Sequence, residues 1–188
     1  QHALTDDTDT DAILAYLHTH TDIDLVVFGG ETGLVHGSAD VLTETMHRLH
    51  RPFACFAPSR AASRIEGCKR FSKQLMRELG IPTPACTVCD TPRDALVCVQ
   101  EMRVKDEQSH TKLSADDLPV IKRTGLAGGK GVFLPSTWDD AVRTLDELCQ
   151  TCADECVLLE ARHHGEEVSV MGVCNGRDVQ LLPLAQDY

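Results

Sequence analysis

Long apolar runs are missing from this sequence of 188 residues. The longest ones fall far short of the roughly 20 residues that a membrane-spanning helix needs, and no basic segment followed by an apolar one opens the chain as a secretory leader would. Glycine and proline, at 13 and 8 residues, are too few for a collagen-like chain, and a hydrophobic content of 42% is too high for a disordered one. We therefore expect a soluble globular protein with one ordinary domain or two small ones.

Basic residues are also in short supply. Lysine and arginine number 18 against 29 aspartate and glutamate residues, which gives a formal net charge of −11. An acidic surface repels polyanions, so we expect no nucleic-acid partner and no anionic membrane partner. The same balance permits a small anionic ligand, because local lysines and backbone amides can bind one inside an acidic protein.

Cysteine, with nine residues, is abundant by contrast. Without a leader, these residues are expected to be reduced thiols in the cytoplasm. Two pairs have the spacing of zinc ligands, Cys86 with Cys89 and Cys149 with Cys152. However, Cys149, Cys152 and Cys156 follow a helical spacing, as one buried stripe would, and the first pair falls in a predicted strand. Buried thiols are therefore favoured over zinc, and no metal ligand is assigned.

The first part of the chain alternates helices with short apolar runs, which is typical of an α/β fold. The apolar run at residues 25–28 stops at Gly29 and Gly30, as a buried parallel strand that feeds a functional loop would. The expected elements are a helix capped by Asp9 or Thr10, the strand at 25–28, a helix from Gly37 or Ser38, and a strand at 53–56. We interpret residues 1–66 as the end of a doubly wound, Rossmann-like domain that binds ligands at its strand C-termini.

After this part, a proline-rich linker at residues 81–84 indicates a boundary. The elements expected around it are a helix at 59–79, strands at 85–88, 118–122, 132–134 and 156–160, helices at 92–102 and 137–152, an exposed polar loop at 103–117, and strands at 167–174 and 179–184 joined by an Asn175-Gly176 turn. We assign residues 67–188 to a second, partial domain, with a smaller lobe at about 84–158.

The strongest chemical signal is a glycine-rich loop between two of these strands. Its four glycines let backbone amides turn toward an anion, and Lys122 and Lys130 add positive charge. The glycines are Gly125, Gly128, Gly129 and Gly131. The loop is not a P-loop, because Thr124 stands where the first glycine of that motif belongs and no helix is predicted to follow. A strand–loop–strand cover over phosphates is the predicted structure.

Several motifs, in order along the chain, resemble one family, glycinamide ribonucleotide synthetase (phosphoribosylamine–glycine ligase) of the ATP-grasp superfamily. They are Glu-Gly-Cys-Lys-Arg-Phe at 66–71, Gly-Ile-Pro-Thr at 80–83, the loop at 122–132, Gly-Glu-Glu-Val-Ser at 165–169, and the segments 29–40 and 182–187. The resemblance implies an ATP-grasp fold. It also implies an enzyme of purine biosynthesis that uses ATP to join glycine to phosphoribosylamine through an acyl phosphate, with these small molecules as its substrates.

The resemblance also implies roles for individual residues. The lysines that contact the nucleotide phosphates match Lys69 and Lys122. The flexible loop that closes over the phosphates matches Gly125, Gly128, Gly129, Lys130 and Gly131. The hinge that reads adenine through backbone groups matches Glu160 and Ala161, and the acid that binds the ribose hydroxyls matches Glu167. The amine-substrate loop matches Gly29, Glu31 and Asp40. No catalytic residue is assigned, and ligands for Mg²⁺ are expected beyond Tyr188.

The sequence departs from the family pattern at several positions. Gly30 and Gly33 replace two prolines, and Ala161-Arg162 replaces an acidic–aromatic pair. The family's first strand and its Mg²⁺ ligands have no match here, so we expect an internal piece of a ligase that is weak or inactive alone. Two alternatives are another ATP-grasp carboxylate–amine ligase and a non-catalytic nucleotide-binding module.

Overall fold

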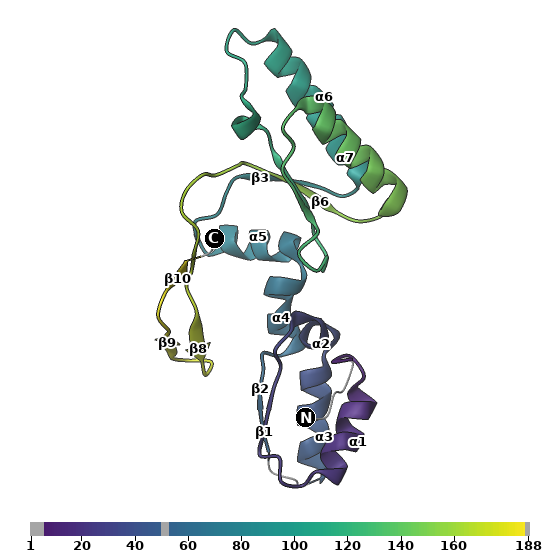
Figure 1. Cartoon of the computed structure of the whole chain (residues 1–188), viewed down its shortest axis with the longest axis vertical. Coiled ribbons are helices and arrows are strands. Elements are labelled where there is room, and N and C mark those ends of the chain that lie inside the picture. The colour runs from purple at the N-terminus through teal and green to yellow at the C-terminus, as the bar shows by residue number, and fades with distance from the viewer. Residues whose placement is uncertain (1–5, 50–52, 187–188) are drawn as a thin grey trace.

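The computed structural model describes residues 6–49 and 53–186. The molecule is elongated, with an N-terminal part, a helical connection, a sheet covered by two helices, and a C-terminal arm (Figure 1). The fold class is α/β, as predicted. No helix within the described ranges is both long enough and apolar enough to cross a bilayer.

The N-terminal part contains a two-stranded parallel sheet. Its elements are α1 (Thr10–Thr19), β1 (Leu25–Val27), α2 (Glu31–His36), α3 (Ser38–Leu49) and β2 (Ala54–Phe56). β1 and β2 pair in parallel with Val26 opposite Cys55, which confirms the predicted parallel pairing, but the predicted burial of β1 is wrong, because Leu25 and Val27 are 54% and 57% exposed. α3 packs against both α1 and β2 and supplies buried Leu42 and Met46. Asp9 caps α1 by accepting a hydrogen bond from the Ala12 amide at 3.0 Å.

The segment after β1 is more ordered than predicted. Residues 29–40 were expected to form a loop, but α2 occupies the middle of this segment. Gly37 ends the helix in a left-handed conformation with φ of +96°, which glycine adopts without a steric penalty. Asp7, which precedes α1, also contacts α2, because its carboxylate accepts a hydrogen bond from the Gly33 amide at 3.1 Å. This contact joins residues far apart in sequence, so local patterns could not reveal it.

The predicted helix at 59–79 is two helices, α4 (Arg60–Gly67) and α5 (Lys69–Glu78). Cys68 separates them in an extended conformation, with φ of −144° and ψ of +99°. The break is stabilised from outside the helices, since the Lys69 amide donates a hydrogen bond to the Thr124 carbonyl at 2.9 Å. Gly67 fits closely against α2, where a Cβ atom would lie 2.7 Å from a Val35 methyl carbon.

A four-stranded antiparallel sheet follows, in the order β3-β6-β4-β5. Its strands are β3 (Cys86–Cys89), β4 (Val120–Arg123), β5 (Val132–Phe133) and β6 (Val157–Glu160), and its helices are α6 (Pro92–Gln108) and α7 (Trp138–Thr151). The two helices pack against each other on one face of the sheet (Figure 1). Val99, Ile121, Leu145 and Leu159 lie in the core between them.

The expected polar loop at 103–117 is only partly a loop. α6 continues to Gln108, and a short 3-10 turn, η1 (Ala115–Asp117), follows later. The polar residues of this last helical stretch are held by α7: Arg103 pairs with Asp139 at 2.7 Å, and the Trp138 indole donates to Asp106 at 2.9 Å. Residues 103–108 therefore lack an apolar period because they form the exposed end of a helix, and the predicted loop is confined to the residues after Gln108.

The C-terminal arm contains β7 (Val168–Ser169), β8 (Gly172–Cys174), β9 (Val179–Leu181) and β10 (Ala185–Gln186). β8 and β9 form an antiparallel hairpin across the predicted turn, and the Asn175 side chain accepts from the Asp178 amide at 2.8 Å. The predicted strand at 167–174 is divided into β7 and β8, the predicted strand at 179–184 is shortened to β9, and β10, which pairs with β7, lies beyond it. The hairpin leaves apolar side chains exposed, with Val179 and Leu181 both at 61%.

Candidate functional site

A cavity of about 250 Å³ lies between α5 and the sheet. Leu158 and Glu160 face this cavity, because they alternate along β6 with Val157 and Leu159, which belong to the core under α6 and α7. α5 lies on the side of the sheet away from those two helices (Figure 1). The lining residues are Lys69, Ser72, Lys73, Met76, Thr83, Pro84, Lys122, Leu158 and Glu160.

The Glu160 carboxylate sits between two lysines of this cavity. Its side chain is only 2% exposed, and its oxygens pair with the ammonium groups of Lys73 and Lys122. Burial raises the pKa of Glu160, but hydrogen bonds and charge interactions with the two lysines outweigh that effect, so the pKa lies below its ordinary value. The carboxylate is therefore ionised at neutral pH, with one lysine ammonium group paired to each oxygen.

Lys69 and Lys122, the two predicted phosphate lysines, line the same cavity. Lys69 begins α5, and its ammonium group donates to the Gly125 carbonyl at 3.5 Å, at the start of the glycine-rich loop. Lys122 lies on β4, just before that loop, and its side chain is 28% exposed. The fold thus brings two cations that are far apart in sequence to the base of one loop.

The glycine-rich loop connects β4 to β5, which confirms the predicted strand–loop–strand, and the two strands pair antiparallel. Gly128 and Gly129 have φ of +54° and +77°, a conformation that other residues adopt at a cost. A Cβ atom on Gly131 would lie 2.7 Å from that of Ala127. Three glycines are thus required by this turn, whatever the loop binds.

Glu155 anchors the base of the loop and was not identified from the sequence. Its carboxylate accepts hydrogen bonds from the Gly125 amide at 3.1 Å and from the Arg123 guanidinium at 2.8 Å. Burial raises the pKa of Glu155, but these two partners lower it by more, so the net shift is downward. The sequence could not predict these contacts, because Glu155 is a single acidic residue before a strand and its partners lie about 30 residues away.

The predicted hinge lies at the end of β6. The Ala161 amide donates to the Ala85 carbonyl at 2.8 Å, so this N–H group belongs to the sheet, and recognition of a base would fall to other backbone groups. A second cavity, of about 330 Å³, adjoins the same residues and is lined by Trp138, Met102 and Leu113 among others. Glu167 is exposed in the following segment and lines neither cavity.

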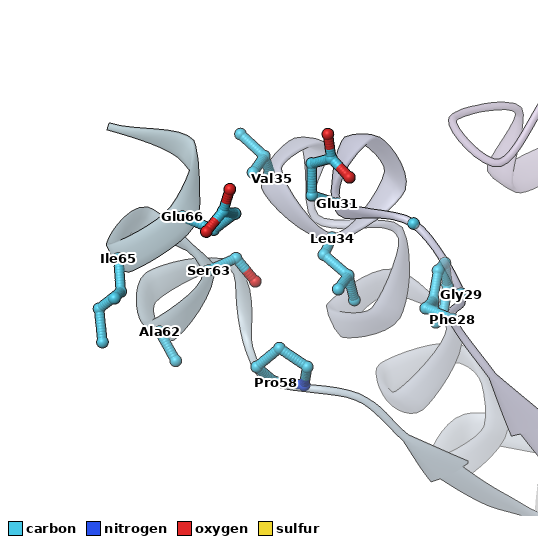
Figure 2. A pocket seen from close by; sticks show the side chains of 11 residues that line it. Phe28, Gly29, Glu31, Leu34, Val35, Pro58, Ala62, Ser63, Ile65 and Glu66 are labelled. Atoms are coloured by element: carbon cyan, nitrogen blue, oxygen red, sulfur yellow. The ribbon is translucent and has the colours of Figure 1, made fainter. Parts of the chain in front are cut away.

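The predicted substrate residues lie in the N-terminal part, around a third cavity of about 340 Å³ (Figure 2). Gly29 and Glu31 line one wall, and α4 supplies the opposite wall, including Glu66, which the sequence did not mark as a site residue. Asp40 is not among the lining residues. Its carboxylate instead accepts a hydrogen bond from the Arg60 amide at 3.1 Å, at the first turn of α4.

The cysteines are free thiols, and no group of three or more histidine, cysteine or acidic side chains gathers as metal ligands would within the described residues. The predicted stripe of Cys149, Cys152 and Cys156 is wrong, because α7 ends at Thr151 and Cys156 lies outside the helix. Burial, with a smaller contribution from Cys98, raises the pKa of the Cys89 thiol to about 12.

Comparisons with known proteins agree with this arrangement. Residues 67–188 match the sequence profile described as phosphoribosylglycinamide synthetase, ATP-grasp (A) domain. The chain is 34% identical over 183 residues to the phosphoribosylamine–glycine ligase of Methanocorpusculum labreanum, a match covering 97% of this chain and 38% of that relative. It is 33% identical over 190 residues to a bifunctional purine biosynthetic protein of Saccharomyces cerevisiae, covering 98% of this chain and 21% of that protein.

Solved structures show the same similarity. The phosphoribosylamine–glycine ligase of Thermotoga maritima superimposes with a TM-score of 0.55 and 27% identity, over 69% of this chain and 31% of that one. An N5-carboxyaminoimidazole synthetase of Staphylococcus aureus, complexed with ADP, gives a TM-score of 0.62 over 98% of this chain and 42% of that one, and its 13% identity shows the fold alone.

The chain spans about two fifths of the length of the curated ligases that it matches, 38% and 40% for two of them. The profile match covers all three lysines of the cavity, the glycine-rich loop and the end of β6 at Glu160. The chain belongs to the phosphoribosylglycinamide synthetase family, whose ATP-grasp (A) domain is matched by its residues 67–188.

Proposed function

We propose that this chain carries the nucleotide site of an ATP-dependent carbon–nitrogen ligase of purine biosynthesis, one that joins glycine to phosphoribosylamine in the cytoplasm. The observation that carries the proposal is the convergence of Lys69 and Lys122 on one cavity, with the glycine-rich loop beginning beside it, where Lys69 contacts the Gly125 carbonyl. In this proposal residues 1–66 are part of an N-terminal α/β domain. Residues 67–188 are part of an ATP-grasp domain, with 84–158 as the lobe that covers the nucleotide.

Different residues of the site are proposed to bind different parts of ATP and of the amine substrate. Lys122 offers point charge to phosphate oxygens, and Lys69 does the same from the other side of the loop base. The loop glycines let amides approach the phosphates and exclude water, which would otherwise destroy an acyl phosphate. Glu160 with Ala161, and Glu167, are proposed for the adenine and ribose, and Gly29, Glu31 and Asp40 for the amine substrate.

ATP supplies the phosphoryl group that activates the carboxylate of glycine for attack by the amine. Magnesium is typical of such chemistry, since it bridges the phosphates, and it is held by one or two carboxylates in most sites. The described residues of this cavity do not fit that ion, because its one carboxylate, Glu160, is already paired with two lysines. No residue of this cavity is therefore assigned as a ligand of magnesium.

The reaction is tested with the native full-length protein, ATP, Mg²⁺, glycine and phosphoribosylamine. Formation of ADP that requires both substrates supports the proposal, and absence of ADP contradicts it. Release of ADP with a different acid and amine would favour another ATP-grasp ligase. Binding of ATP without turnover of any such pair would favour a nucleotide-binding module.

The placement of the phosphates is tested by Lys122→Ala. Removing one of two cations that face a polyphosphate is expected to weaken ATP binding by about 100-fold, because a charge-assisted contact is lost in a partly desolvated cavity. Lys105→Ala is the matched control, since Lys105 is an exposed residue of α6 outside every cavity described above. Calorimetric titration with ATP measures both. Equal affinities for Lys122→Ala and wild type would place the phosphates elsewhere.

A further inference from the structure

Lys73 is a buried lysine of the same cavity that neither the sequence nor the family motif marked as a site residue. It lies on α5, one turn after Lys69, and is only 8% exposed. A lysine buried to this degree requires partners for its charge, because desolvation disfavours the ammonium form. The number of these partners determines whether the Lys73 ammonium group can also bind a ligand.

The partners of Lys73 account for all three of its N–H donors. The ammonium group donates to the Thr83 hydroxyl at 2.5 Å and to the Pro84 carbonyl at 3.2 Å, and it pairs with Oε1 of Glu160. An ammonium group has three donors and no acceptor. Lys73 therefore has no donor left for a phosphate oxygen, although it lines the proposed nucleotide cavity.

Lys122 pairs with the same carboxylate as Lys73 but has fewer partners. It pairs with Oε2 of Glu160, and no other hydrogen-bond partner of its ammonium group is found among the described residues. Its side chain is more exposed to the cavity, at 28% against 10% for the Lys73 side chain. One carboxylate thus lies between an enclosed cation and an accessible one.

We propose that Lys73 is a positioning residue of the nucleotide site: it neutralises and holds Glu160, so that the charge of Lys122 remains available to the phosphates. The inference rests on the proposed nucleotide site. Together, Lys73, Glu160 and Lys122 carry a net charge of +1 beside the phosphates. Without Lys73, Glu160 and Lys122 neutralise each other, and the attraction for a polyphosphate falls. Lys73 also ties α5 to the linker before β3, through Thr83 and Pro84.

The experiment measures ATP and adenosine affinities of the native full-length protein by calorimetry, for wild type, Lys73→Met, Lys73→Arg, Glu160→Gln and the Lys73→Met/Glu160→Gln double variant. Lys73→Met is expected to weaken ATP binding about tenfold, because Lys122 then becomes the single counter-charge of Glu160 and its ammonium group is drawn away from the phosphates. Adenosine carries no phosphate, so its affinity is expected to change by less than about twofold. Lys73→Arg keeps the charge and is expected to retain most of the ATP affinity.

The double variant separates positioning from direct binding. In the Glu160→Gln background there is no carboxylate to hold Lys122, so adding Lys73→Met is expected to lower ATP affinity by clearly less than in the wild-type background, about threefold or below against about tenfold. Lys73→Met alone also leaves a buried carboxylate with one partner and destabilises the fold. The double variant lacks that unpaired charge, so if the single variant does not fold, Glu160→Gln is compared with the double variant, and a tenfold loss of ATP affinity there would overturn the proposal.

Two results would overturn the proposal. One is a loss of ATP affinity on Lys73→Met that is equal in the wild-type and Glu160→Gln backgrounds, which would mean direct contact with the phosphates. The other is an equal loss for ATP and adenosine, or none for either. If the wild-type protein binds ATP but forms no ADP with glycine and phosphoribosylamine, the proposed reaction fails and this inference stands. If the wild type does not bind ATP, both fail.

Discussion

Glu155 and Glu160 are surrounded by basic groups and backbone amides rather than by bulk water. In both, the ionised form is favoured by partners that come from other elements: Arg123 and the Gly125 amide for one, Lys73 and Lys122 for the other. Removing a partner from such a group leaves a charge or a polar atom without compensation, which is costly. A substitution of Glu155, Glu160 or one of their partners is therefore expected to affect the whole group of contacting residues.

Glu155→Gln is expected to lower the free energy of unfolding at pH 7 by about 1–2 kcal/mol, because a hydrogen-bonded charged acceptor becomes a neutral one. The pKa of Glu155 lies below its unfolded value of 4.5 in the folded protein. Its stabilisation is thus complete above pH 4.5 and is lost as the pH falls through the lower folded pKa.

Denaturant unfolding between pH 3 and pH 7 measures this effect. The difference between wild type and Glu155→Gln should shrink on acidification, whereas Glu147→Gln, an exposed acid on α7, should behave as wild type throughout. A difference that is constant across this pH range would show that the ionised carboxylate of Glu155 contributes nothing.

At the scale of elements, the glycine-rich loop combines a fixed base with a strained tip. The base is held by the Arg123 amide, which donates to the Gly131 carbonyl at 2.8 Å, and the tip by the Lys130 amide, which donates to the Ala127 carbonyl at 2.9 Å. Gly129 lies at the tip with φ of +77°, and nothing lies within 4 Å of where its Cβ would be. A side chain there costs backbone strain only.

Gly129→Ala is therefore expected to disfavour this loop conformation by about 1 kcal/mol and to weaken ATP binding several-fold. Gly80→Ala is the matched control, because Gly80 also has a positive φ, +66°, and free space around its Cβ position, but follows α5. Both variants should lose similar stability in thermal unfolding. If Gly80→Ala weakened ATP binding as much as Gly129→Ala, the loop would have no specific part in binding.

The strands β4 and β5 and the loop between them were predictable because each depends on a local pattern. The β-branched runs around Lys122 and the glycines that follow it indicate strand, turn and strand without reference to the rest of the chain. The break at Cys68 was not predictable, because it depends on a hydrogen bond from Lys69 to Thr124. Lys73 was missed for the same reason: on a helix it resembles a solvated charge, and only the fold places Glu160 beside it.

At the scale of the whole molecule, the helical connection formed by α4 and α5 lines two cavities. α4 lines the cavity that holds Gly29 and Glu31, and α5 lines the cavity that holds Lys69 and Lys122. The junction between the helices is fixed on both sides, by the close packing of Gly67 on Val35 and by the hydrogen bond of Lys69 to Thr124. A change at this junction would therefore alter both cavities together.

The 188-residue chain also leaves apolar side chains exposed on the β8–β9 hairpin. Val179 and Leu181 lie two residues apart on β9, so both point to the same side of the hairpin, and each is 61% exposed. Contiguous apolar surface of this kind drives association in water, and a short exposed strand adds unpaired backbone groups. We therefore expect the isolated 188-residue polypeptide to self-associate as its concentration rises.

Val179→Thr combined with Leu181→Thr should reduce this association, because the hydroxyls make the same strand surface polar while threonine keeps a high strand propensity. Analytical ultracentrifugation over a range of concentrations measures the effect. Val97→Thr combined with Val104→Thr is the matched control, since both valines are exposed on α6, at 50% and 49%. Equal relief of association by the two pairs would mean that general surface hydrophobicity is responsible, and not the hairpin.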